Sequence, residues 1–216
     1  MSAADDEPTL SFAAAADWER WLERHHGEPS GVWLKLAKKG AGVAGVSYPE
    51  ALDVALCFGW IDARKRPLDE RFWLQRFTPR GPRSRWSQRN RDRIAALAAD
   101  ARMRPSGEAQ VERAKADGRW DAAYPGQRTA IVPPDLQAAL DANRAASDCF
   151  ATLDAANRYA ILYRVEEARR PQTRAARIER FVAMLAAGER LHPQRGPAAG
   201  RPRLPYFPSR GRSSVG

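Results

Sequence analysis

The sequence predicts an α+β protein, with an N-terminal domain built on a small antiparallel sheet packed by helices and an all-helical C-terminal domain. Residues 31–38 alternate between two sets of side chains, as in a half-buried strand. Residues 60–66 and 71–78 flank a four-residue turn, which indicates an antiparallel hairpin. After residue 105 the strand patterns stop and only helical spacing remains. The two halves of the chain therefore differ in class.

Two helices of the N-terminal domain are marked by their ends. Tryptophans and leucines at helical spacing predict a helix over 14–26, ended by Gly27. Ser47 and Glu50 form a capping-box pattern, which starts a second helix. Gly59 is suited to the left-handed position just past that helix, so the chain should reverse there into the hairpin.

A third helix is expected to start near Ser84, a plausible N-cap. A polar residue, Asn90, stands in its inward stripe, whose members are Trp86, Asn90, Ile94, Leu97 and Ala101. Arg85, Arg89 and Arg93 form a second stripe, which is most simply a solvated face. Because a polar group on an apolar face needs a partner, Asn90 should either bridge protein groups or contact a ligand.

The remaining chain reads as helices with defined stops. A helix is predicted from Pro105 to about Lys115, a short one after Pro134, and two longer ones near 155–169 and 173–187. The resulting organisation is a disordered N-terminus (1–10), an α+β domain (11–104), a helix with a connecting loop (105–131), a helical domain (132–192) and a disordered basic tail (193–216).

Composition bounds the function. The chain has 216 residues and a net charge of +10, which favours an anionic partner, although an arginine-rich composition alone also gives a solvated basic surface. No apolar run is long enough to cross a bilayer, and the N-terminus lacks a secretory signal pattern. Two unrelated cysteines form no disulfide framework, so we expect a cytoplasmic protein. No metal-ligand spacing is present, and no cofactor is expected.

The junction between the hairpin and the third helix holds the candidate site. A helix start offers free N–H groups, and guanidinium groups give paired donors, so a carboxylate or phosphate could bind there. The solvated reading of these arginines stays open beside the anion site. The candidate ligand-binding residues are Trp60, Asp62, Arg76, Thr78, Arg80, Ser84, Trp86, Ser87 and Asn90.

An enzyme acting on an anionic substrate is another possibility. It would use Cys57 or Asp62 beside the arginines. However, Cys57 lies near a helix C-terminus, where the dipole raises a thiol pKa, so a buried inert thiol is favoured. For Asp62, a structural salt bridge is favoured over a catalytic role. No catalytic residue is therefore assigned.

With these residues assembled, the chain resembles the YdeI/OmpD-associated family, also called bacteriocin-protection proteins. The N-terminal motifs are ALCFGWIDARKR (55–66), RFTPRGPRSRWSQRN (76–90) and RMRPSGEAQ (102–110). The C-terminal motifs are VPPDLQAALDANRAASDCFATLD (132–154) and EEARRPQTRAARIERFVAML (166–185). The resemblance implies a role in protection against bacteriocins or cationic antimicrobial peptides, with no established reaction and no known cofactor.

We therefore predict a non-enzymatic stress or antimicrobial-protection protein that binds a small anionic ligand. A nucleic-acid-binding protein that uses Arg85, Arg89, Arg93 and the basic tail ranks second. A net charge of +10 should repel cationic peptides, which argues against direct sequestration of such a peptide.

Overall fold

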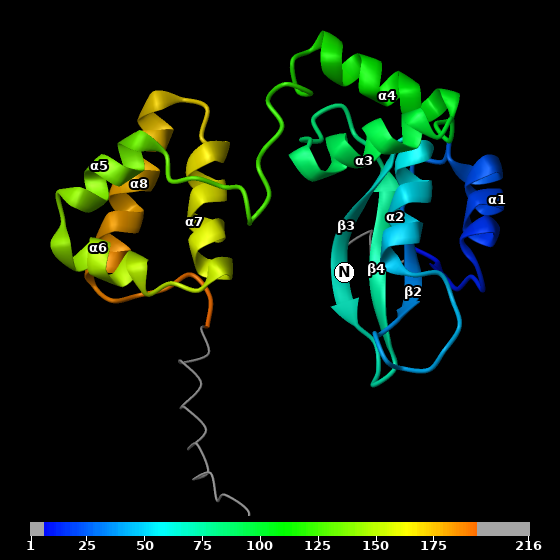
Figure 1. Ribbon diagram of the computed structural model, residues 1–216, viewed down its shortest axis with the longest axis horizontal. Helices are drawn as coiled ribbons and strands as arrows, with labels where there is room; N and C mark the ends of the chain where they lie inside the picture. Colours follow the sequence, from blue (N-terminus) through cyan, green and yellow to red (C-terminus); the bar gives the residue numbers. More distant parts are fainter. Residues whose placement is uncertain (1–6, 194–216) are drawn as a thin grey trace, which may run out of the picture. The chain divides into compact units, whose positions relative to one another are not determined.

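The computed structural model describes residues 7–193 and confirms the α+β class (Figure 1). The chain forms two compact units, which divide between Thr129 and Ala130. The first contains a sheet with helices, and the second contains helices. Residues 194–216 of the tail predicted for 193–216 lie outside the described residues, as do residues 1–6. No helix in the described part is long and apolar enough to cross a membrane.

The sheet has four strands in the order β1-β2-β4-β3. The strands are β1 (Thr9–Leu10), β2 (Val32–Ala37), β3 (Trp60–Pro67) and β4 (Phe72–Pro79). The predicted hairpin is confirmed, because β3 and β4 pair antiparallel, and β4 also pairs antiparallel with β2. β1 adds a short parallel edge, so the sheet is mixed rather than wholly antiparallel.

The order of residues 7–10 corrects the prediction that all of 1–10 is disordered. The Glu7 carboxylate accepts hydrogen bonds from Nε and Nη2 of Arg76, at 2.6 and 2.5 Å. It also accepts one from the Gly31 amide at 2.9 Å. Both side chains of this ion pair are mostly buried, which holds the segment before β1 against the sheet. The Arg76 guanidinium lowers the pKa of Glu7, so this attachment weakens only as the pH falls through that lowered value.

The helices of the first unit are α1 (Ala15–His25), α2 (Tyr48–Cys57), α3 (Gln88–Ala99) and α4 (Pro105–Ala116). The capping box at Ser47 is confirmed, and Gly59 has the expected left-handed backbone with φ of +78°. In Figure 1, α3 and α4 lie beyond the end of the sheet where β3 begins and β4 ends. This end of the sheet holds the candidate site.

The start of α3 differs from the prediction. The helix begins at Gln88 with Ser87 as its N-cap, and the Ser87 hydroxyl accepts a hydrogen bond from the Asn90 amide at 3.2 Å. Ser84 instead closes a turn, because its hydroxyl accepts from the Gly81 amide at 3.1 Å. A β-bridge between Ser87 and Tyr124 fixes the start of the helix, and that contact is invisible to local sequence patterns.

The core of the first unit is rich in aromatic residues. Trp18, Trp60 and Phe77 are buried, and the Trp18 ring contacts Trp60 edge-on and Phe77 at a tilt. The Trp60 indole also donates to the carbonyl of His26 at 2.9 Å. At one edge α4 meets the end of α2 backbone to backbone, because Gly107 has no side chain to hold the two helices apart.

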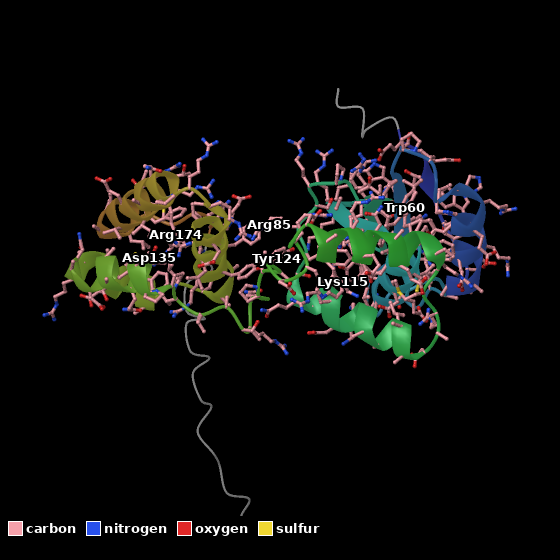
Figure 2. All side chains as sticks on the ribbon, turned by 90° about the horizontal axis from the view of Figure 1, so that it is seen from above. Trp60, Arg85, Lys115, Tyr124, Asp135 and Arg174 are labelled. Atoms are coloured by element: carbon pink, nitrogen blue, oxygen red, sulfur yellow. The ribbon has the colours of Figure 1, made fainter. Side chains whose placement is uncertain are left out.

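The second unit consists of α5 (Pro134–Asp141), α6 (Arg144–Ala151), α7 (Ala155–Glu167) and α8 (Pro171–Ala186). Three of these helices were predicted. α6 was not predicted. It is separated from α5 by a short break and begins with Asn143 as its N-cap. Arg174 joins α8 to α5, with bonds of 2.6 and 3.0 Å to the Asp135 carboxylate, and Figure 2 shows the two side chains together.

Candidate functional site

The structure gives several predicted site residues structural partners. Arg76 is held by Glu7, and Trp60 is part of the core. Ser84 and Ser87 bond to backbone amides. The Thr78 hydroxyl makes one long contact of 3.5 Å to the carbonyl of Pro79. An anion site at the helix start, as predicted from the sequence, therefore has fewer side chains free to bind a ligand than expected.

Arg80, by contrast, is a buried cation without a counter-ion in contact. Its side chain follows β4 into the interior, where it is only 4% exposed. Nη1 donates to the carbonyl of Arg85 at 3.0 Å, and the guanidinium lies 3.6 Å over the ring of Trp86. Arg80 takes part in none of the ion pairs found among residues 7–193. Burial, as the largest cause, lowers the pKa of Arg80 to about 10, so the group remains charged at neutral pH.

Two nitrogens of Arg80, Nε and Nη2, have no hydrogen-bond partner in the described protein, although both are buried. The Trp86 Nε1 atom, which belongs to a side chain only 2% exposed, has no protein partner either. An unsatisfied buried donor costs about 1–3 kcal/mol, and a charged one costs more. The stacked Arg80 and Trp86 side chains thus carry three buried donors without a partner, and an anion or other acceptor bound beside them would be stabilised.

Aromatic rings and further arginines surround this contact. Trp120 meets Trp86 edge-on at 4.9 Å between ring centres, and Arg91 lies over Trp120. Arg85 lies 5.0 Å over Tyr124, and the two are seen together in Figure 2. The sequence reading linked neither Trp120 nor Tyr124 to the site, because both come from the loop after α4. The only hint in the sequence was that both are aromatic residues, which often pack against arginines.

Arg119 completes the cluster from the same loop. Its Nη1 donates to the carbonyl of Ser84 at 3.1 Å, and its guanidinium pairs with Asp117. The positive charge of Arg119 is thus already balanced. It nevertheless lowers the pKa of Arg80 further, after burial has made the main contribution.

Asp62 lies on β3 and is held by Tyr48. The Tyr48 hydroxyl donates to the Asp62 carboxylate at 2.8 Å. Burial, followed by the charge of Asp62, raises the pKa of Tyr48 far above neutrality, so the phenol stays protonated. Asp62 also stabilises the charged form of Arg80 through space, without forming an ion pair with it. The predicted structural role of Asp62 is therefore met by a tyrosine rather than an arginine.

Asn90 faces inward, as predicted, and is 9% exposed on the same helix side as Ile94 and Leu97. Its backbone amide is used by the N-cap. Of the hydrogen bonds found within residues 7–193, none involves the side-chain amide of Asn90. The bridging version of the Asn90 hypothesis therefore has no hydrogen bond to support it, and the ligand-facing version stays a prediction.

The predicted arginine stripe does not form one solvated face. Arg85 precedes the helix and packs on Tyr124, while Arg93 is paired with Asp53 of α2. Of these three arginines, Arg89 alone is exposed. Nucleic-acid binding through this stripe stays a prediction, with fewer exposed charges available to it.

Cys57 is 2% exposed, and burial raises the pKa of its thiol to about 11. The thiolate is the reactive form, so we expect Cys57 to resist alkylation at neutral pH while the protein is folded. Cys149, which is partly exposed, serves as the internal control. Mass spectrometry after iodoacetamide treatment should show label on Cys149 first, and on both cysteines in denaturant. Rapid labelling of native Cys57 would revive the nucleophile hypothesis.

The larger surface cavities lie away from Arg80. A polar one of about 560 Å³ sits beside the start of α3 and is lined by Gln88, Arg89, Asp92 and residues 126–129. An apolar one of about 800 Å³ lies within the second unit and is lined by α8, α5 and the two residues that follow α5. No group of three or more metal-ligating side chains occurs in the part of the chain that the structure describes.

Two different protein-family models match the chain, one in each of the two structural units. Residues 10–110 match the model of a domain of unknown function, DUF8412. Residues 129–188 match the family described as bacteriocin-protection, YdeI or OmpD-associated. No curated protein and no solved structure matches the chain.

The family resemblance seen in the sequence is thus confirmed for part of the chain. The motifs between residues 55 and 110, which we also assigned to that resemblance, fall within the match to the other model. The two motifs after residue 131, at 132–154 and 166–185, lie entirely within the match to the expected family. Residues 129–188, which include all four helices of the C-terminal unit, match the YdeI/OmpD-associated family model.

Proposed function

We propose that this protein is a non-enzymatic bacterial stress or bacteriocin-protection protein whose N-terminal unit binds a small anion through Arg80. The family description of residues 129–188 supports the first part of the proposal. The observation that carries the second part is the buried guanidinium of Arg80, whose Nε and Nη2 donors have no protein acceptor.

The same chain shows how its other arginines use these two nitrogens. Arg76 directs Nε and Nη2 at the two oxygens of Glu7. Arg174 directs the same pair at the two oxygens of Asp135. Two parallel donors match the two oxygens of an oxyanion, which makes such pairs both strong and specific. Arg80 therefore has the donor pair that elsewhere in this protein holds a carboxylate.

The surroundings make this donor pair selective for a small ligand. Trp86 fixes the guanidinium by stacking, and the Arg85 carbonyl holds its third nitrogen, so the orientation of the donors is set before binding. Low accessibility strengthens any charge interaction formed there. A bulky cationic peptide is a poor match, both in size and in charge, for a protein of net charge +10.

A thermal-shift screen at constant ionic strength tests the proposal. The panel contains small carboxylates, inorganic phosphate, sulfate and nucleotides, with sodium chloride as the reference. A ligand that binds only the folded protein adds about 2.7 kcal/mol at 100 times its Kd, which raises Tm. We expect at least one anion to raise the Tm of the natural protein and to lose this effect in Arg80→Ala.

Arg83→Ala is the matched control, because Arg83 lies in the same loop but is exposed. It should leave the ligand response intact. A screen without any hit that depends on Arg80 would contradict the proposal.

A further inference from the structure

We propose that the ligand of Arg80 is a monocarboxylate, not a phosphate or another dianion. This inference rests on the proposed function and specifies its ligand class. It is carried by the number of uncompensated charges at the site, the geometry of the donors and the position of Asp62.

The first argument is charge balance. Within the described chain, the only guanidinium of this cluster that is both nine-tenths buried and without a carboxylate in contact is that of Arg80. Arg119 is balanced by Asp117. One buried positive charge balances one negative charge, whereas a dianion would carry a second charge into a poorly solvated place. Burying an unbalanced charge is costly, so the site favours a monoanion.

The second argument concerns Asp62. Its carboxylate is close enough to stabilise the charged form of Arg80, yet it is directed to the Tyr48 hydroxyl. Any additional negative charge on a ligand at Arg80 would be repelled by Asp62. The Tyr48 phenol keeps its proton and brings no positive charge to the Asp62 carboxylate. The repulsion is small for a monoanion paired with Arg80 and greater for a dianion.

The third argument is donor geometry. Nε–H and one Nη2–H of a guanidinium point in the same direction and lie in one plane. The two oxygens of a carboxylate lie in one plane at the matching spacing, as the Arg76–Glu7 and Arg174–Asp135 pairs show in this protein. A chloride ion offers both donors the same single atom, without the two separate oxygens that match their spacing. A carboxylate therefore satisfies both donors at once with a single negative charge, whereas a phosphate dianion that does so brings a second charge.

Acetate and methyl phosphate form a matched pair of probes, because both carry a single methyl group. At about pH 8 the phosphate ester is a dianion, since its second pKa is near 6. Isothermal titration calorimetry at constant ionic strength should show acetate, propionate or benzoate binding at least tenfold more tightly than methyl phosphate or sulfate. Arg80→Met should abolish carboxylate binding, with circular dichroism confirming that the variant is folded.

Trp86→Phe provides a second variant, because it keeps an aromatic ring under Arg80 and removes only the Nε1–H donor. It should retain the preference for carboxylates even if affinity falls. Tighter binding of methyl phosphate or sulfate, lost in Arg80→Met, would overturn the carboxylate assignment and leave the anion-binding function standing. Carboxylate binding that survives Arg80→Met would overturn the assignment to this site. No Arg80-dependent binding by any anion would overturn both proposals.

Discussion

Replacing Gly107 by alanine is expected to destabilise the N-terminal unit by about 3 kcal/mol or more, near the upper end of overpacking effects. A Cβ atom on Gly107 would stand 2.1 Å from the carbonyl oxygen of Cys57 and 3.0 Å from that of Leu56. Both obstacles are backbone atoms at the end of α2, so relief requires α4 to move as a whole. A loss of stability would be informative about this contact, because alanine within a helix normally stabilises by about 1 kcal/mol relative to glycine.

Urea unfolding followed by tryptophan fluorescence measures this effect. Gly27→Ala is the control, because an added Cβ there meets nothing within 4 Å. It should change the free energy of unfolding by less than about 1 kcal/mol. If Gly107→Ala were equally mild, the close approach of α4 to α2 would be wrong.

The second large effect is stabilisation, whereas Gly107→Ala destabilises the protein. Arg80→Met should raise the free energy of unfolding of the ligand-free protein by about 1–3 kcal/mol, while it abolishes anion binding. The substitution removes a buried charge with two unsatisfied donors, and methionine is long and flexible enough to fill the same space. The loss of one hydrogen bond to Arg85 offsets part of the gain.

Arg76→Met is the contrasting variant, because Arg76 has its carboxylate partner within the protein. It should destabilise by about 2 kcal/mol or more, since Glu7 would be left buried without a counter-ion. Chemical denaturation of both variants in ligand-free buffer checks the pair. Destabilisation by Arg80→Met as large as that by Arg76→Met would mean that Arg80 is an ordinary structural residue.

Much of the fold follows from local patterns in the sequence. The capping box at Ser47, the left-handed Gly59 and the inward face of Asn90 are set by neighbouring residues, and each was predicted correctly. The two strands of the hairpin were found from their alternation and the turn between them.

The elements that were missed depend on distant contacts. β1 has only two residues and is held through Glu7, whose partner Arg76 lies 69 positions away. Ser84 and Ser87 are equally good caps by residue type, and the bridge to Tyr124 decides between them. No local rule contains that information.

In the candidate site too, residue types could be predicted from the sequence, but contacts between distant residues could not. Arg80 and Trp86 were named from the sequence, but so was Arg76, which the structure pairs with a carboxylate. The composition of the loop could not tell a guanidinium with a protein partner from one without. That distinction requires the fold, because it depends on which acidic side chains come within reach.

The most direct test of the central claim, that Arg80 binds an anion, is NMR observation of its Nε–H group. A buried Nε–H exchanges slowly enough to be followed, and the resonance is assigned by its loss in Arg80→Lys. We predict a saturable downfield shift of this proton when acetate or benzoate is added, with sodium chloride at the same ionic strength giving none. A resonance that stays unchanged through carboxylate, phosphate and sulfate titrations would contradict the claim.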